Sequence, residues 1–269
     1  MTRLSFVANA VVLATLPLFA GVRIQTENTD LSTKKVTTDV ILLDASRMRI
    51  DSDDGKSVLF LTDGGRDRMV MLDKTKNTYQ EIDEQMMKQM GEQMSGAMAQ
   101  MQAQLKNMPP EQRAMMEKMM KGKMPQAAAA APKTVYTAKG SGSVNGFSCT
   151  KYEGARSGEK EAEVCAALPG QLKLTASDFQ VLDKMKQFSS SLLSALASSP
   201  IQVSVPTSAG FESGYDGFPV QKVEFSGGQA TKRGELKAIT RTNFSDADFS
   251  LGTAKKVEMP IPGGRGKQR

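Results

Sequence analysis

Hydrophobic and polar positions alternate through much of residues 23–80, and turn sequences separate the short runs. This pattern predicts strands over residues 36–43, 47–51, 57–62 and 67–72. The turns at 53–55 and 63–65 contain Asp and Gly, which favour the short connections of an antiparallel meander. The alternation predicts a sheet with one face on a core and the other face in water.

The periodicity changes at residue 81. Residues 81–124 contain twelve of the eighteen methionines and very few β-branched residues. One set of methionines recurs every three or four positions, as on one stripe of an amphipathic helix: Met87, Met90, Met94, Met98 and Met101. Pro109 and Pro110 end that helix. A second set then follows with a spacing of four: Met115, Met116, Met119 and Met120. We therefore predict an inserted helical hairpin over 81–124, and a linker over the Ala- and Pro-rich residues 125–133.

Strand-like patterns return over residues 134–260. We expect a strand beginning at Val135, a hairpin of 147–152 and 161–167 around Ser157 and Gly158, and further strands over 218–225 and 235–244. Residues 175–196 have helical periodicity. The chain thus predicts one β domain in two halves, 23–80 and 134–260, with a disordered tail over 261–269.

The N-terminus is typical of a secretion signal. Arg3 precedes an uncharged apolar run over residues 4–22, and we assign residues 1–22 as a signal peptide. Ala20 or Gly21 provides the small residue that cleavage requires, whereas Leu18 and Phe19 are bulky for the position two residues earlier. Both cleavage and retention as an N-terminal anchor therefore stay open. Val22 stands where a lipidated cysteine would be, so the pattern predicts an exported periplasmic or cell-envelope protein without a lipid anchor.

The amino-acid composition excludes several classes of function. The chain is 39% hydrophobic and 24% charged, and its net charge of +6 comes from scattered Lys and Arg, so no nucleic-acid partner is expected. It contains no His, which removes Ser-His-Asp and Cys-His catalysis and imidazole ligation of metals. No phosphate-binding loop is present. We expect a protein that is not an enzyme, has no catalytic residues and uses no cofactor.

Cys149 and Cys165 are the two cysteines, and an exported protein meets an oxidising compartment. If the hairpin turns about Ser157, the two cysteines lie directly opposite each other, at a separation that suits a disulfide. A redox-active or metal-binding pair is the alternative, but there is no Cys-x-x-Cys motif.

The methionine stripe has three interpretations. Methionine is an adaptable apolar residue that packs well in a helix seam or a lid. The stripe could also contact a hydrophobic ligand or a membrane surface, because several lysines flank it. Thioether sulfur also binds Cu(I), so copper binding is the third interpretation. All nine methionines of the two sets named above are candidate contacts for such a ligand or metal.

Several short segments together resemble a known family. They are residues 47–51, 69–73, 76–79 with the Met-rich segment that follows, 144–152 and 249–251. In this order they resemble an exported bacterial family of unknown function, distantly similar to the outer-membrane lipoprotein carriers and their receptors. Cys165 departs from the pattern, because many relatives are expected to have an aromatic residue there.

The resemblance implies an α+β fold: a strongly curved antiparallel sheet forming a half-open barrel, with helices on its concave face. It implies a binding or chaperone-like module for a hydrophobic ligand such as a lipid or acyl chain, covered by the helices of 81–124 and 175–197. A copper-binding protein and an envelope scaffold that docks a partner protein through its Met-rich hairpin remain the alternatives. Fold alone does not decide between them.

Overall fold

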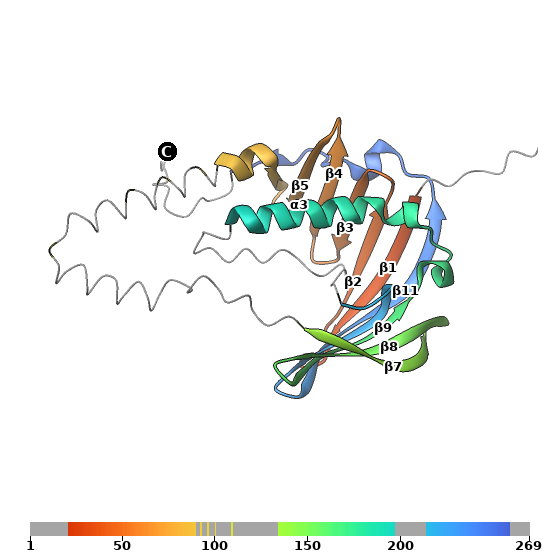
Figure 1. The fold of residues 1–269 in the computed structure, drawn as a ribbon. Helices are drawn as coiled ribbons and strands as arrows, with labels where there is room; N and C mark the ends of the chain where they lie inside the picture. Colours follow the sequence, from red (N-terminus) through yellow and green to blue (C-terminus); the bar gives the residue numbers. More distant parts are fainter. Residues whose placement is uncertain are drawn as a thin grey trace, which may run out of the picture.

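The computed structural model describes residues 21–89, 134–196 and 214–258, together with the isolated positions 92, 96, 100 and 109. Within these ranges the chain forms a curved sheet of twelve strands with a long helix packed against it (Figure 1). The sheet is not closed, because strands β12 and β7 occupy its two ends.

The first half of the chain supplies β1 (Gly21–Asp30), β2 (Val36–Leu43), β3 (Arg47–Ser52), β4 (Lys56–Asp63), β5 (Arg66–Asp73) and β6 (Thr78–Asp83). A helical segment covers 84–89. The second half supplies β7 (Val135–Val144), β8 (Phe147–Arg156), β9 (Glu159–Ala167), β10 (Phe218–Ser226), β11 (Gln229–Thr242) and the short β12 (Lys255–Lys256). Between β9 and β10 lie the 3-10 turns η1 (Pro169–Leu172) and η2 (Ala176–Phe179) and helix α3 (Gln180–Leu196), and η3 (Asp246–Phe249) precedes β12.

Two meanders make up the sheet. Strands β1 to β6 are neighbours in chain order, and so are β7 to β11. The halves join where β1 pairs with β11, for example through Ile24 opposite Ile239. The segment between β6 and β7 therefore links opposite ends of the sheet. The predicted strands are confirmed, and among the described strands the only pair that departs from an antiparallel arrangement is β12 with β6, which is parallel.

Both faces of the N-terminal half are covered, so the prediction of one face in water is wrong for this half. On one face the largest hydrophobic cluster includes Val22, Phe60 and α3. On the other face, Leu42, Leu59, Leu61, Val70 and Leu72 pack beneath Phe249.

The cover on this second face is the C-terminal segment from Phe244 to Ala254. Arg49 is 9% exposed. Its Nη1 donates hydrogen bonds to the carbonyl oxygens of Asp248 (3.1 Å) and Ser250 (2.9 Å). The Arg47 guanidinium lies 4.2 Å from the centre of the Phe249 ring. These contacts explain why two arginines of β3 lie beneath a mostly apolar cover.

Strand β1 begins before the predicted domain boundary at residue 23. Gly21 and Val22, assigned to the leader above, belong to β1, and Val22 is 1% exposed in the core. Among the described residues, no helix is long and apolar enough to span a membrane.

Candidate functional site

The face of the sheet beneath α3 carries two parallel rows of apolar side chains. Cross-strand pairing places the first row in this order, from β1 to β6: Val22, Leu43, Met48, Phe60, Met69 and Ile82. The second row, one pleat away, is Ile24, Ile41, Ile50, Val58 and Met71. Side chains two residues apart on a strand share a face, so both rows lie on the same side of the sheet.

Helix α3 covers the first row of apolar side chains. Val181 and Leu182 are buried, and the ring of Phe188 lies 5.7 Å from that of Phe60, tilted by 60°. Such tilted aromatic pairs are stabilising beyond the area they bury. Every member of the first row is buried.

The second row is covered only in part. Ile24 and Ile41 are buried, but Ile50, Val58 and Met71 keep exposed surface while still packing against the core. Met86 of the helical segment 84–89 and Met185 of α3 are likewise half-buried against the same core. Five half-exposed apolar residues, from two helical segments and three neighbouring strands, thus border the covered core. We take these five as the candidate site and call them the apolar rim.

The beginning of α3 is attached to the sheet by a bidentate ion pair. Arg241 of β11 donates from Nη1 to Asp178 Oδ1 (2.9 Å) and from Nη2 to Asp178 Oδ2 (2.7 Å). Its Nη2 also donates to the Lys173 carbonyl oxygen at 3.1 Å. Asp178 lies in η2, immediately before α3, and accepts the backbone N–H of Thr175 at 2.7 Å. The pair therefore holds the segment that leads into α3.

Burial of Asp178 would by itself raise the pKa of its carboxyl group. The hydrogen bonds from Arg241 and Thr175 favour the charged form more strongly, and the pKa is lowered. The carboxylate is thus ionised at neutral pH, which suits a structural ion pair. This pair was not predicted from the sequence. Its sequence signal is the spacing of Thr175 and Asp178, a capping pattern three residues apart ahead of a helix.

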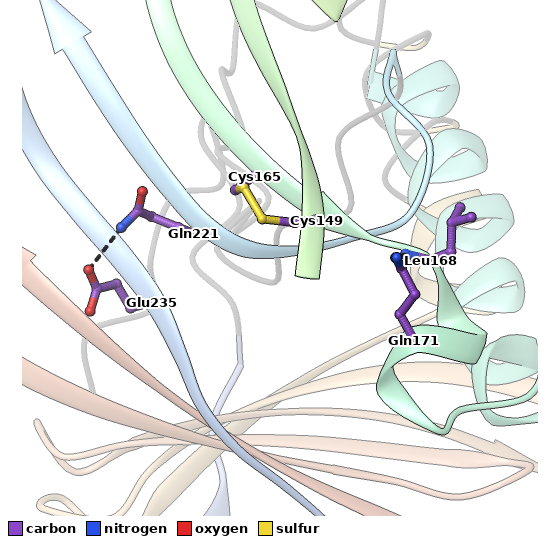
Figure 2. The surroundings of a disulfide bond; sticks show 6 residues. All are labelled: Cys149, Cys165, Leu168, Gln171, Gln221 and Glu235. Carbon is purple, nitrogen blue, oxygen red and sulfur yellow. Dashed lines mark hydrogen bonds between the residues drawn. A yellow bond between two sulfur atoms is a disulfide. The ribbon is translucent and has the colours of Figure 1, made fainter. Parts of the chain in front are cut away.

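The disulfide between Cys149 and Cys165 is present, with a Cα–Cα distance of 5.4 Å (Figure 2). The predicted direct opposition is wrong, because Cys165 pairs with Lys151, two residues along β8. The turn consists of Ser157 and Gly158, so Arg156 pairs with Glu159 and the pairing is shifted by one residue from a turn centred on Ser157; a bulge between Gly154 and Ala155 shifts it by one residue more. The disulfide therefore joins the strands diagonally.

Both cysteines are buried in the same large cluster as α3. Figure 2 shows Gln221 and Glu235 on neighbouring strands near the disulfide, where Gln221 Nε2 donates to Glu235 Oε1 at 3.0 Å. At the end of β9 the Leu168 N–H donates to the Gln171 side chain at 2.8 Å. These hydrogen bonds join neighbouring parts of the structure, and the residues around the disulfide pack against one another in the core.

Of the nine candidate methionines, the structure describes one. Met87 is 8% exposed and packs in the core. The other eight lie outside the described residues. Within the described ranges, no group of three or more Cys, Asp or Glu side chains is placed to hold a metal ion.

A second charged cluster lies on β3 and β4. Asp51 accepts hydrogen bonds from Arg49 Nε, Lys74 Nζ (2.7 Å) and Ser57 Oγ. Burial alone would raise the pKa of Asp51, but these three donors outweigh it and the pKa is lowered. Because Arg49 also binds the C-terminal segment, this cluster positions the cover of the second face.

The chain matches a family of known sequences and has distant similarity to solved structures. A family model described as "Domain of unknown function (DUF4412)" matches residues 62–253, which is more than half of the chain. No curated protein matches. Among solved structures, an uncharacterized conserved protein from Thermus thermophilus is 9% identical, with a TM-score of 0.44, over 90% of this chain and 92% of that one. The MucA/MucB complex of Pseudomonas aeruginosa contains a chain 10% identical, with a TM-score of 0.40, over 89% of this chain and 58% of that one.

Proposed function

This chain belongs to the DUF4412 family, and we propose that it is a binding module that shelters a hydrophobic ligand between its sheet and α3. The expectation of a family of unknown function is confirmed by the family match. In this proposal α3 lies on the concave side of the sheet, and an apolar ligand such as an acyl chain lies beside it.

The observation that carries the proposal is the apolar rim. A sheet that served only as a scaffold would gain stability by covering Ile50, Val58 and Met71 completely, because each buried methylene contributes about 0.8 kcal/mol. These three side chains are instead adjacent, aligned across β3, β4 and β5, and half-exposed next to a packed helix. Aligned apolar surface of this kind is what an elongated apolar ligand would cover.

The methionines in the rim support a ligand site that adapts its shape. Met71 lies on β5, Met86 in the segment 84–89 and Met185 on α3, and each is partly buried against the same core cluster. Unbranched thioether side chains adjust their rotamers to ligands of different shape. The rim therefore favours recognition of an apolar surface over recognition of specific polar groups.

The test compares two valines that differ in the face they occupy. Val58 belongs to the rim, whereas Val40 on β2 is also half-buried but packs on the opposite face, against the Leu59 cluster. We expect Val58→Gln to weaken binding of a fluorescent fatty acid to the full-length protein at least tenfold. Val40→Gln should leave the affinity within twofold.

Native mass spectrometry of the protein purified from its own cell envelope adds an independent measurement. A co-purifying lipid that Val58→Gln depletes is the expected result. Equal affinities for both valine variants, together with no co-purifying lipid, would contradict the proposal.

A further inference from the structure

The first described strand starts at the end of the apolar leader. Strand β1 begins at Gly21, which pairs with Thr242 of β11. Val22 pairs with Leu43 on one side and with Arg241 on the other, and it is 1% exposed. Removal of Val22 would therefore leave a gap in the first apolar row, so the chain has to retain it.

Gly21 is also part of the packing. A Cβ atom at this position would lie 2.5 Å from Cδ2 and Cε2 of the Phe244 ring and 3.0 Å from the Leu43 carbonyl oxygen. The Phe244 ring is itself packed edge-on against Phe249, with the ring centres 5.6 Å apart. The ring thus occupies the space that a side chain would need, and Gly21 fits beneath it.

The sequence just before β1 supplies one of the two small residues that cleavage requires. Export peptidases favour a small residue immediately before the bond they cut and another two positions earlier, and here the earlier position holds Leu18, or Phe19 for a cut one residue later. Ala20 supplies the small residue next to the bond without removing any residue of β1, whereas a cut after Gly21 would remove the residue that packs beneath Phe244. The two candidate cuts match the recognition pattern equally, so the packing of Gly21 beneath Phe244 selects the bond after Ala20.

We infer that the chain is exported and that a leader peptidase hydrolyses the Ala20–Gly21 peptide bond. Water adds across this bond, so that Ala20 leaves with a new carboxylate and Gly21 acquires a free α-amino group. The mature protein then begins at the first residue of β1. This inference does not depend on the ligand proposed above.

The experiment expresses the full chain in a Gram-negative bacterium and determines the N-terminus and intact mass of the protein released from the periplasm. The expected N-terminus is Gly21, with a mass equal to residues 21–269. An N-terminus at Val22 or any other residue, or an intact Met1 chain, would overturn the inference.

Two variants separate processing from folding. Ala20→Leu changes a residue that precedes β1, and we expect it to lower the yield of mature protein more than tenfold while precursor accumulates in the membrane. Gly21→Ala keeps a small residue after the cut, so the same bond should be cleaved, but the urea midpoint should fall because of the contact with Phe244. Normal processing of Ala20→Leu would contradict the assigned bond, as would a shifted N-terminus in Gly21→Ala.

Discussion

The ion pair between Asp178 and Arg241 gives the sharpest test of how α3 is held on the sheet. The Asp178 side chain is 9% exposed and that of Arg241 is 33% exposed. Breaking a fully buried pair by removing one partner costs about 3–5 kcal/mol, whereas exposed pairs contribute about 0–1 kcal/mol. Arg241→Met removes three hydrogen bonds but leaves Asp178 with those from Thr175. We therefore expect a loss of about 2–3 kcal/mol of unfolding free energy, between these two limits.

Urea unfolding, monitored by circular dichroism, measures this loss. The slope of the unfolding free energy against urea concentration should not change. Arg156→Met is the matched control. Arg156 pairs with Glu161 at 3.0 Å, but both side chains are well exposed, at 45% and 31%, and the cost should stay below about 1 kcal/mol. Equal costs for the two variants would refute the reasoning.

The pH dependence of the same variant provides a second check. The pKa of Asp178 is lowered in the folded protein from an ordinary value of 3.8, so its contribution is complete above that value. This contribution of Asp178 to the unfolding free energy is lost as the pH falls below 3.8 and then through the lower pKa of the folded protein. The reason is that the unfolded state binds the proton more readily than the folded state in this range. The stability difference between wild type and Arg241→Met should therefore be constant near neutral pH and shrink below pH 3.8. A difference that stays constant into this acid range would contradict the assigned role of the carboxylate.

Three further changes test other parts of the fold. Replacing Cys149 and Cys165 together by Ser should cost about 3 kcal/mol in urea unfolding and abolish the effect of a reductant on stability; a variant as stable as the oxidised protein would contradict this. Phe188→Ala should cost about 3–5 kcal/mol by the same assay, because it empties the space above Phe60, and a cost below about 1 kcal/mol would show that α3 is not closely packed. Gly217→Ala places a Cβ 2.6 Å from the Ala167 carbonyl oxygen, whereas one at Gly228 meets no atom within 4 Å. Both glycines have positive φ, so the thermal midpoint should fall further for Gly217→Ala than for Gly228→Ala, and equal shifts would refute the steric argument.

Periodicity predicted most elements because their signals are local. The strand expected over 36–43 has these bounds in the structure, and the helix expected from 175 begins at Gln180, after the turn that Asp178 caps. The start of β1 was missed for a physical reason. The apolar leader continues without interruption into Val22, so hydrophobicity alone does not separate an exported leader from a buried first strand.

Parts of the candidate site could not be predicted from the sequence. The disulfide partners were predictable because the chain has two cysteines and a local hairpin joins their strands. Their diagonal register was not, because the centre of the two-residue turn and the bulge near Gly154 each shift the pairing by one residue, and the residues around Gly154 do not specify the bulge. The apolar rim was missed because it combines side chains from three strands and two helical segments, whose exposure depends on where α3 packs.

The covering of both sheet faces follows from a pattern that single alternation does not describe. Val58, Leu59, Phe60 and Leu61 are consecutive apolar residues of β4, and such runs are typical of strands buried on both sides. Val58 and Phe60 point toward α3, whereas Leu59 and Leu61 pack beneath Phe249 near the end of the chain. The run indicates that a second cover exists, but its identity depends on contacts between residues about 200 positions apart, such as Arg49 with Ser250. The C-terminal segment buries Leu59 and its neighbours, so the proposed function places the ligand on the opposite face, beside α3, where Ile50, Val58 and Met71 are only partly buried.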